Sequence, residues 1–296
     1  MDPIRVVARR GSFVESVHSV HAVAVQDGAV VAESGDAAFL TSLRSSAKPF
    51  QALPLVRSRT DLDAADIAIA SASHRAEPEQ IDAVRALLAK APAAEDDLEC
   101  GLQEGRAPER IYHNCSGKHA GMLAASRAHG WPLAGYRQPD HPLQREILAE
   151  IASAAAVDHA DIGTGVDGCG VVAFALPLER VAFMFSRLEQ RDGGAEVAAA
   201  MRAYPRLIGG RGATDTKLME QLPGWIAKGG AEGLLCAAGP GGIGVAAKCA
   251  DGAYRPLGPA IAAFLRRLGH AVADDLARAE VQNSRGEAVG EVVAET

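Results

Sequence analysis

Ser45 and Lys48 are the pair in this chain best placed for nucleophilic chemistry. If a helix begins here, their spacing puts a hydroxyl and an amine on the same face, one turn apart. A serine is a weak nucleophile until a neighbouring base takes its proton, and an uncharged lysine amine can be that base. A simple helix cap by Ser45 or Ser46 would explain the same residues. The catalytic interpretation therefore needs companions elsewhere in the chain.

A lysine base works near neutral pH only if its pKa lies well below the usual value of about 10.4. Burial of the amine supplies part of that shift, and a second cation in the same pocket supplies more. Lys248 closes the apolar run of residues 243–247 and would be this second cation if its amine reaches the same pocket. Most lysines at such positions are exposed residues of an edge strand.

Ser73 is a second hydroxyl of interest. It follows an apolar run, residues 66–72, that we predict to be a strand, and it precedes a helix that begins at Pro78. A serine in this position can face a cleft. It can equally be an ordinary N-cap.

Polar side chains and a thiol crowd residues 112–122, just before an apolar helix. Crowding of this kind at a helix N-terminus is typical of a substrate or anion site. A capped helix start alone would leave Cys115, Lys118 and His119 unexplained. Residues 163–171 hold four glycines around Asp167 and Cys169, which favours either a tight turn or a loop whose backbone approaches a ligand.

The order of the predicted elements indicates an α/β (α+β) fold, with an antiparallel sheet built from both chain ends, flanking helices and a helix-rich lobe. We expect one catalytic domain over residues 1–296 made of two packed lobes. The sheet lobe would comprise about residues 1–44 and 205–296, and the helical lobe about residues 45–204. Residues 256–278 are predicted to form one amphipathic helix.

Composition narrows the class of protein. Of the 296 residues, 48% are hydrophobic and 23% charged, as in a globular protein. A net charge of −7, with no cluster of lysine and arginine, argues against nucleic-acid binding. No segment is apolar and long enough to span a membrane, and the N-terminus does not resemble a secretory signal. With five cysteines, an odd number, we expect reduced thiols in a cytoplasmic protein.

Together these segments resemble the asparaginase II family, the thermolabile group typified by rhizobial enzymes, over nearly the whole chain. The most specific block is Asn114-Cys115-Ser116-Gly117-Lys118-His119. The other matching segments are Val14-Glu15-Ser16-Val17-His18, Arg44-Ser45-Ser46-Ala47-Lys48-Pro49, Ser73-His74, Gly165-Val166-Asp167-Gly168-Cys169-Gly170 and Gly244-Val245-Ala246-Ala247-Lys248. Ser73 stands in Ala-Ser-His-Arg, where Ser-His-Ser-Gly is more usual in the family.

The resemblance implies a fold like that of serine β-lactamases and glutaminases, and hydrolysis of L-asparagine to L-aspartate and ammonia by a homodimer. The implied catalytic set is Ser45 as nucleophile, Lys48 as its base, Ser73 and Lys248. The implied metal ligands, usually for zinc, are Cys115, Lys118 and Cys169. The implied substrate-side residues are Arg44, His119 and Asp167.

Asp167 suits the α-ammonium of an amino acid, while Arg44 could bind its carboxylate or orient Asp167. We expect zinc to tune substrate affinity and to hold the Asp167 loop. The mechanistic alternative is a zinc hydrolase that attacks with metal-bound hydroxide. Other functional alternatives are a glutaminase, a hydrolase that recognises β-lactams, and a non-catalytic sensor of amino acids or zinc. A nucleophile with two lysines exceeds what a sensor needs.

Overall fold

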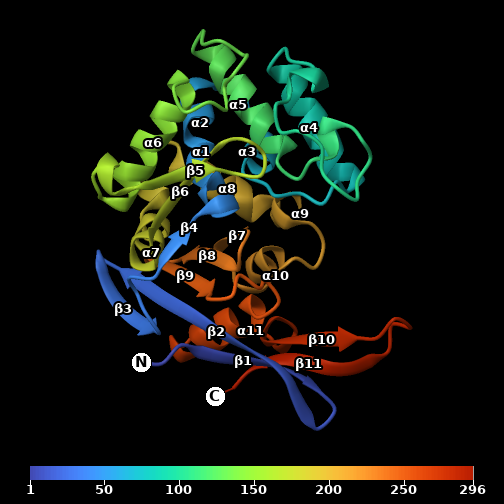
Figure 1. Cartoon of the computed structure of the whole chain (residues 1–296). Coiled ribbons are helices and arrows are strands. Elements are labelled where there is room, and N and C mark those ends of the chain that lie inside the picture. The colour runs from blue at the N-terminus through green and yellow to red at the C-terminus, as the bar shows by residue number, and fades with distance from the viewer. Residues whose placement is uncertain (296) are drawn as a thin grey trace.

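The computed structural model describes residues 1–295 and is built around one curled eight-stranded antiparallel sheet (Figure 1). The strand order is β10-β11-β1-β2-β9-β8-β7, with β3 paired to β2. The strands are β1 (Ile4–Arg10), β2 (Phe13–Gln26), β3 (Ala29–Ser34), β7 (Ile226–Gly230), β8 (Leu234–Gly239), β9 (Ile243–Cys249), β10 (Arg278–Gln282) and β11 (Ala288–Ala294). The predicted antiparallel sheet from both chain ends is confirmed.

The chain between β3 and β7 is mainly helical and forms the upper part of the molecule in Figure 1. Its helices are α1 (Lys48–Gln51), α2 (Leu53–Ser58), α3 (Ala64–Ala70), α4 (Pro78–Lys90), α5 (Ser116–Ala128), α6 (Pro142–Ala155), α7 (Leu178–Ser186), α8 (Gly194–Ala203), α9 (Pro205–Gly209) and α10 (Thr214–Gln221). A small sheet of order β4-β6-β5 lies among them, made of β4 (Leu40–Ser42), β5 (Gly163–Val166) and β6 (Val172–Pro177). Within residues 1–295, no helix has the length and apolar character needed to cross a membrane.

Helices pack on both faces of the large sheet. Helix α7 lies against β9, β2 and β8, and α11 (Leu257–Arg267) lies against strands on the other face. Gly244 of β9 makes the α7 contact possible, since a Cβ there would come within 2.1 Å of the Ala182 carbonyl oxygen. The hydrophobic core therefore continues from the sheet into the helices.

The C-terminal helix is shorter than the predicted helix over residues 256–278. Helix α11 ends at Arg267, and Gly269 adopts a left-handed φ of 88°. Its N–H bonds the Arg266 carbonyl, and the His270 N–H bonds that of Leu265, which is the Schellman pattern that ends helices. A separate short helix, α12 (Asp274–Ala277), precedes β10.

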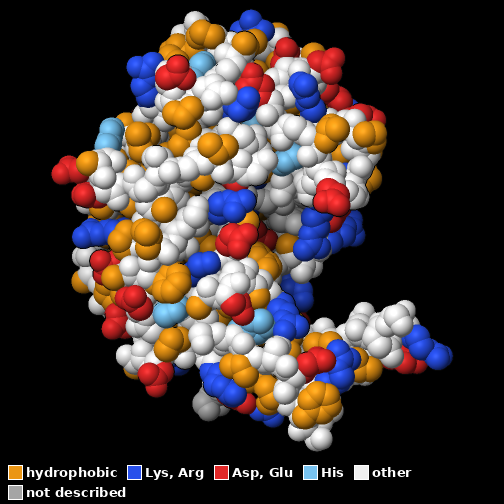
Figure 2. Space-filling model, viewed as in Figure 1, with side chains coloured by type: hydrophobic (Ala, Val, Ile, Leu, Met, Phe, Trp, Pro, Cys, Tyr) orange, Lys and Arg blue, Asp and Glu red, His pale blue; other side chains and the backbone are white. Residues whose placement is uncertain are grey.

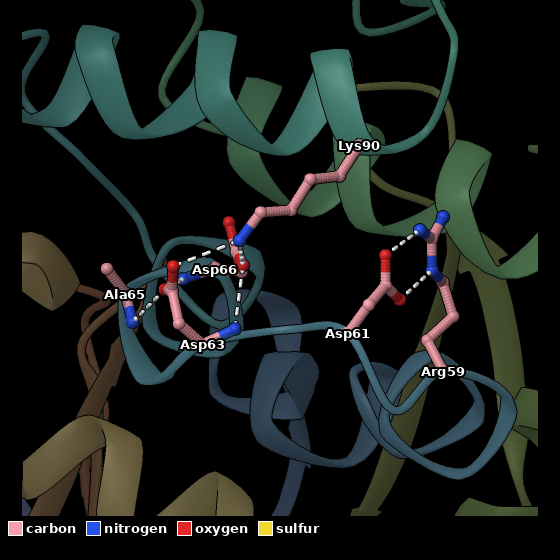
Figure 3. Close-up of polar contacts among 6 residues, drawn as sticks. All are labelled: Arg59, Asp61, Asp63, Ala65, Asp66 and Lys90. Carbon is pink, nitrogen blue, oxygen red and sulfur yellow. Dashed lines mark hydrogen bonds and ion pairs between the residues drawn. The ribbon is translucent and has the colours of Figure 1, made fainter.

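Residues 64–70 are helical, so the predicted strand over residues 66–72 is wrong. Asp63 caps α3, because its side chain accepts from the N–H groups of Ala65 and Asp66, and Asp66 bonds back to the Asp63 N–H. Lys90, at the end of α4, adds ion pairs to both carboxylates, while the neighbouring Asp61 binds only Arg59 among the residues drawn (Figure 3). This reciprocal cap outweighs the strand-like run of apolar residues.

Replacing Asp63 with alanine will therefore destabilise the protein by about 1 kcal/mol, the usual cost of losing an N-cap. The measurement is the midpoint of urea unfolding. Asp61→Ala is the matched control, since this exposed carboxylate caps no helix, and its midpoint should stay near that of the unmodified protein. Equal shifts in the two variants would contradict the capping role.

Candidate active site

Ser45 lies in a single 3-10 turn, η1 (Arg44–Ala47), that continues directly into α1. Arg44 has a left-handed φ of 45°, a conformation that is costly for a residue with a side chain and is common at functional sites. The two candidate serines differ in their surroundings. Ser46 is fully buried and donates to the Lys228 carbonyl at 3.0 Å, whereas Ser45 is partly exposed. Ser45 is thus the hydroxyl that a substrate can reach.

Lys48 is fully buried, and its amine contacts Ser73. Nζ donates to the Ser73 hydroxyl at 2.9 Å and to the Ala72 carbonyl at 2.5 Å. Burial lowers the pKa of the Lys48 ammonium. Among its charged neighbours, Lys118 acts in the same direction and Cys115 against it. The structure therefore brings Lys48 and Ser73 into contact, with a base whose proton affinity is reduced, while Ser45 lies one turn before Lys48 in the chain.

Lys248 does not join this group. Its ammonium donates to the Glu232 carbonyl, and within residues 1–295 it shows no bond to Ser45, Lys48 or Ser73. Lys248 lies on β9, which is two strands from β7, and β7 is the strand of the large sheet that contacts η1 most extensively. With about 4.8 Å between neighbouring strands, that places it roughly 10 Å from the edge of the sheet. The prediction for Lys248 is wrong in this structure.

Lys228 of β7 is the second lysine of the site. It is fully buried, its carbonyl accepts from Ser46, and its Nζ lies 3.7 Å from an oxygen of Asp215. Burial lowers the pKa of Lys228 to about 8; Asp215 opposes this shift and the positive charge of Lys48 adds to it. Lys228, and not Lys248, is therefore the second cation beside Lys48.

A sequence signal for Lys228 does exist. Lys228-Gly229-Gly230 has the lysine–any–glycine pattern that follows S-x-x-K and a second serine in β-lactamases. Gly230 lets η1 approach, since a Cβ there would lie 2.8 Å from the Leu43 carbonyl oxygen and 2.9 Å from the Ser46 hydroxyl.

Cys115, Lys118 and Cys169 form a buried cluster at the start of α5. Lys118 Nζ donates to Cys169 Sγ at 3.1 Å. The neighbouring Cys169 thiol and the positive charges of Lys48 and Lys118 hold the pKa of Cys115 well below its usual value despite burial. Two sulfurs and an amine around one buried point are a donor set that fits zinc.

Arg44 and Asp167 connect the nucleophile turn to this cluster. Arg44 Nε donates to Asp167 Oδ1 at 2.8 Å, and the Gly168 N–H donates to the same oxygen at 2.8 Å. Asp167 is two residues from Cys169. Of the two roles considered for Arg44, the geometry therefore supports orientation of Asp167.

His119 is fully buried next to the cysteine cluster. Its Nδ1 lies 2.6 Å from the Tyr136 hydroxyl, whose oxygen accepts from the Glu99 N–H at 2.8 Å. The hydroxyl proton therefore points at Nδ1, and the His119 proton lies on Nε2, which has no partner among residues 1–295. In this conformation His119 does not face a substrate directly. Tyr136 stood out in no sequence motif.

His74 is a further residue that the sequence did not single out by itself. Its Nδ1 accepts from the Ala76 N–H, so Nε2 donates to the Ser116 hydroxyl at 2.8 Å. Burial lowers the pKa of His74 to about 3, which keeps the ring neutral. This bond ties the Ser73 segment to the start of α5.

Charged side chains of both signs surround a hollow between the helical part and the sheet (Figure 2). A cavity of about 610 Å³ lies elsewhere, between α11 and the chain ends, and shares no residue with the cluster described above.

Residues 6–294 match the model of the family described as L-asparaginase II. A search of curated proteins gave no significant match. Among solved structures, "EstCE1, a hydrolase with promiscuous acyltransferase activity" is 11% identical, with a TM-score of 0.39 over 78% of this chain and 88% of that chain. A β-lactamase from Mycobacterium bovis is 14% identical, with a TM-score of 0.33 over 79% and 88%. Scores this low establish no common fold.

Proposed function

The chain belongs to the L-asparaginase II family, and from this premise we propose that it hydrolyses L-asparagine to L-aspartate and ammonia through an acyl-enzyme on Ser45. The observation that carries the proposal is the contact of 2.9 Å between the buried Lys48 amine and the Ser73 hydroxyl, one turn after the accessible Ser45. A binding protein would not need a buried base in contact with one hydroxyl and one turn after an accessible serine.

In the proposed reaction, Ser45 Oγ attacks the side-chain carbonyl carbon of asparagine and its proton passes to Lys48 Nζ. Ser73 relays that proton to the amide nitrogen, which leaves as ammonia. Water then hydrolyses the ester by the reverse transfers. The Ser45 N–H lies in the first turn of a helix, where N–H groups lack helical partners, and it is our choice for one oxyanion donor.

Asp167 would bind the α-ammonium of the substrate. Arg44 would orient the carboxylate of Asp167, as the bond of 2.8 Å from Arg44 Nε to Asp167 Oδ1 supports. Cys115, Lys118 and Cys169 would hold zinc. When bound, the metal would stiffen the Asp167 loop and so tune affinity. A homodimer, implied by the family resemblance, remains a prediction that light scattering would test.

The direct test of function is ammonia release from L-asparagine, compared with L-glutamine and a chromogenic β-lactam. We expect L-asparagine to have the highest kcat/KM of the three. Faster turnover of either other substrate would redirect the assignment to a glutaminase or a β-lactam hydrolase. Binding of asparagine, seen as a raised Tm, with no turnover would indicate a sensor.

Removal of zinc by a chelator is expected to raise the KM for L-asparagine several-fold and to change kcat less, because the metal is proposed to position a substrate-binding loop. Metal content by mass spectrometry accompanies the assay, and added zinc should restore the KM. A kcat that collapses with the metal would instead support attack by metal-bound hydroxide.

Activity should fall as pH rises through about 8, where Lys228 loses its charge. The sign follows from the role of Lys228 as a cation: its charged form is present below this pKa and lost above it. The measurement is kcat/KM against pH. In Lys228→Arg, any residual activity should persist to higher pH, because a guanidinium stays charged. An unchanged alkaline limb would contradict this assignment.

A further inference from the structure

His18, Cys249 and Asp251 form a second cluster of metal-binding side chains, away from Ser45. His18 belongs to β2, Cys249 ends β9, and Asp251 lies in the turn that follows. One ligand atom from each residue lies within 4.8 Å of the other two. Among residues 1–295 this is the one group of three or more histidine, cysteine and acidic residues so arranged.

We propose that His18, Cys249 and Asp251 bind a divalent metal ion of the zinc type, in a site separate from Cys115, Lys118 and Cys169. Imidazole, thiolate and carboxylate are the three ligand types of protein zinc sites. A site with one of each favours borderline ions such as Zn²⁺ and Co²⁺ over Mg²⁺ or Ca²⁺. The proposal goes beyond hydrolysis of asparagine and does not depend on it.

Burial and hydrogen bonding give the site a defined shape. Cys249 is fully buried and His18 nearly so, while about half of the Asp251 side chain is exposed. A metal would therefore enter past Asp251, where a water ligand can complete the coordination. The Ala253 N–H donates to Asp251 Oδ1 at 2.8 Å and holds the carboxylate in place.

Two protons, shared between Asp251 and the side chains of Cys249 and His18, lie where the proposed ion would bind. Cys249 Sγ donates to Asp251 Oδ1 at 2.9 Å, and His18 Nδ1 lies 2.6 Å from Oδ2. Because Arg255 Nε donates to His18 Nε2 at 3.0 Å, the imidazole proton is on Nδ1. On binding, the thiol proton leaves to solvent and the imidazole proton moves to Nε2.

Arg255 must then turn away from His18, since Arg255 Nε and His18 Nε2 would both carry a proton. Arg255 and the neighbouring Lys248 are also the cations that oppose a dication here. Arg255 therefore restrains metal binding, and its removal should tighten the site. The bound metal would join β2, β9 and the turn before α11, which also carries Tyr254 against Gly229.

The test is titration of the Cys115→Ser/Cys169→Ser full-length chain with Co²⁺, read by the cobalt–thiolate absorption in the near ultraviolet. We expect one equivalent to bind with this band, and Zn²⁺ to displace it and raise the Tm by several degrees. Cys249→Ser in the same background should abolish the band. Cys100→Ser, the matched control for a buried thiol outside the cluster, should retain it.

Arg255→Met should bind Co²⁺ roughly threefold to fivefold more tightly, the size expected from removing one partly exposed charge. If the double variant does not fold, the comparison is two equivalents in the unmodified chain against one in Cys249→Ser. No thiolate band at millimolar cobalt, or a band that survives Cys249→Ser in the Cys115→Ser/Cys169→Ser chain, would overturn the proposal. In the unmodified chain, an unchanged number of equivalents after Cys249→Ser would overturn it as well. A failure here leaves the assignment of Ser45 untouched.

Discussion

Ser45→Ala should lose L-asparagine hydrolysis by at least about a thousandfold in kcat/KM, because the variant has no hydroxyl to form the acyl-enzyme. The side chain is small and partly exposed, so its removal should leave the fold unchanged. The measurement is ammonia release under single-turnover and steady-state conditions, with the Tm recorded for each variant.

Ser46→Ala is the matched control for this variant. Ser46 is the adjacent serine, but its hydroxyl is buried and bonded to the Lys228 carbonyl. We expect a lower Tm and activity within about tenfold of the unmodified enzyme, since only one buried hydrogen bond is lost. If Ser45→Ala kept more than a few per cent of the activity, the serine route would give way to attack by metal-bound hydroxide.

Lys228→Met should lower kcat/KM by about a hundredfold or more, whereas Lys248→Met should leave it nearly unchanged. Lys228 is fully buried and electrostatically coupled to Lys48, while Lys248 bonds a carbonyl at the edge of the β7–β8 turn. Methionine keeps most of the unbranched side chain and removes the ammonium group, with its charge and its hydrogen bond to the Gly229 carbonyl in Lys228. The pair of variants separates two lysines that the sequence alone does not distinguish.

Loss of Lys228 also leaves Asp215 buried without its ion pair, so stability must be measured alongside activity. Lys228→Arg keeps a cation, and Asp215→Asn/Lys228→Met removes both charges. If the double variant folds but stays inactive, the loss of activity in Lys228→Met comes from the missing charge in catalysis and not from lost stability. An active Lys228→Met, or an inactive but folded Lys248→Met, would contradict the assignment of Lys228 as the second cation of the site.

Local patterns predicted a large part of this structure. The spacing of Ser45 and Lys48 fixes their common face through helix geometry alone, and the turn dipeptides placed the strands at both chain ends. The wrong prediction of a strand over residues 66–72 also has a local cause. The reciprocal cap between Asp63 and Asp66 stabilises a helix there, and the spacing of these two residues is visible in the sequence.

The choice between Lys228 and Lys248 could not be made from alternation, because both side chains lie on the same face of the sheet. In register, Lys228 pairs with Cys236 and Cys236 with Ala246, which is two residues before Lys248. Only the strand order, which places β7 at the edge next to η1, separates them. Strand order depends on contacts across the whole chain.

The cysteine cluster, too, was predictable from local spacing only in part. Cys115 and Lys118 share a helix start, which spacing predicts, but Cys169 comes from the turn between β5 and β6 and joins them through the bond from Lys118 Nζ. Family resemblance supplied that third ligand. No sequence pattern predicted the contact between buried His119 and the Tyr136 hydroxyl, because Tyr136 comes from a loop with no motif.

The central claim is a covalent aspartyl ester on Ser45, and rapid acid quenching during turnover of L-asparagine, followed by peptide mass spectrometry, tests it most directly. We expect an aspartyl adduct on the peptide that contains Ser45, absent from Ser45→Ala. An adduct on Ser73 instead, or no adduct on any peptide at quench times when aspartate is forming, would contradict it.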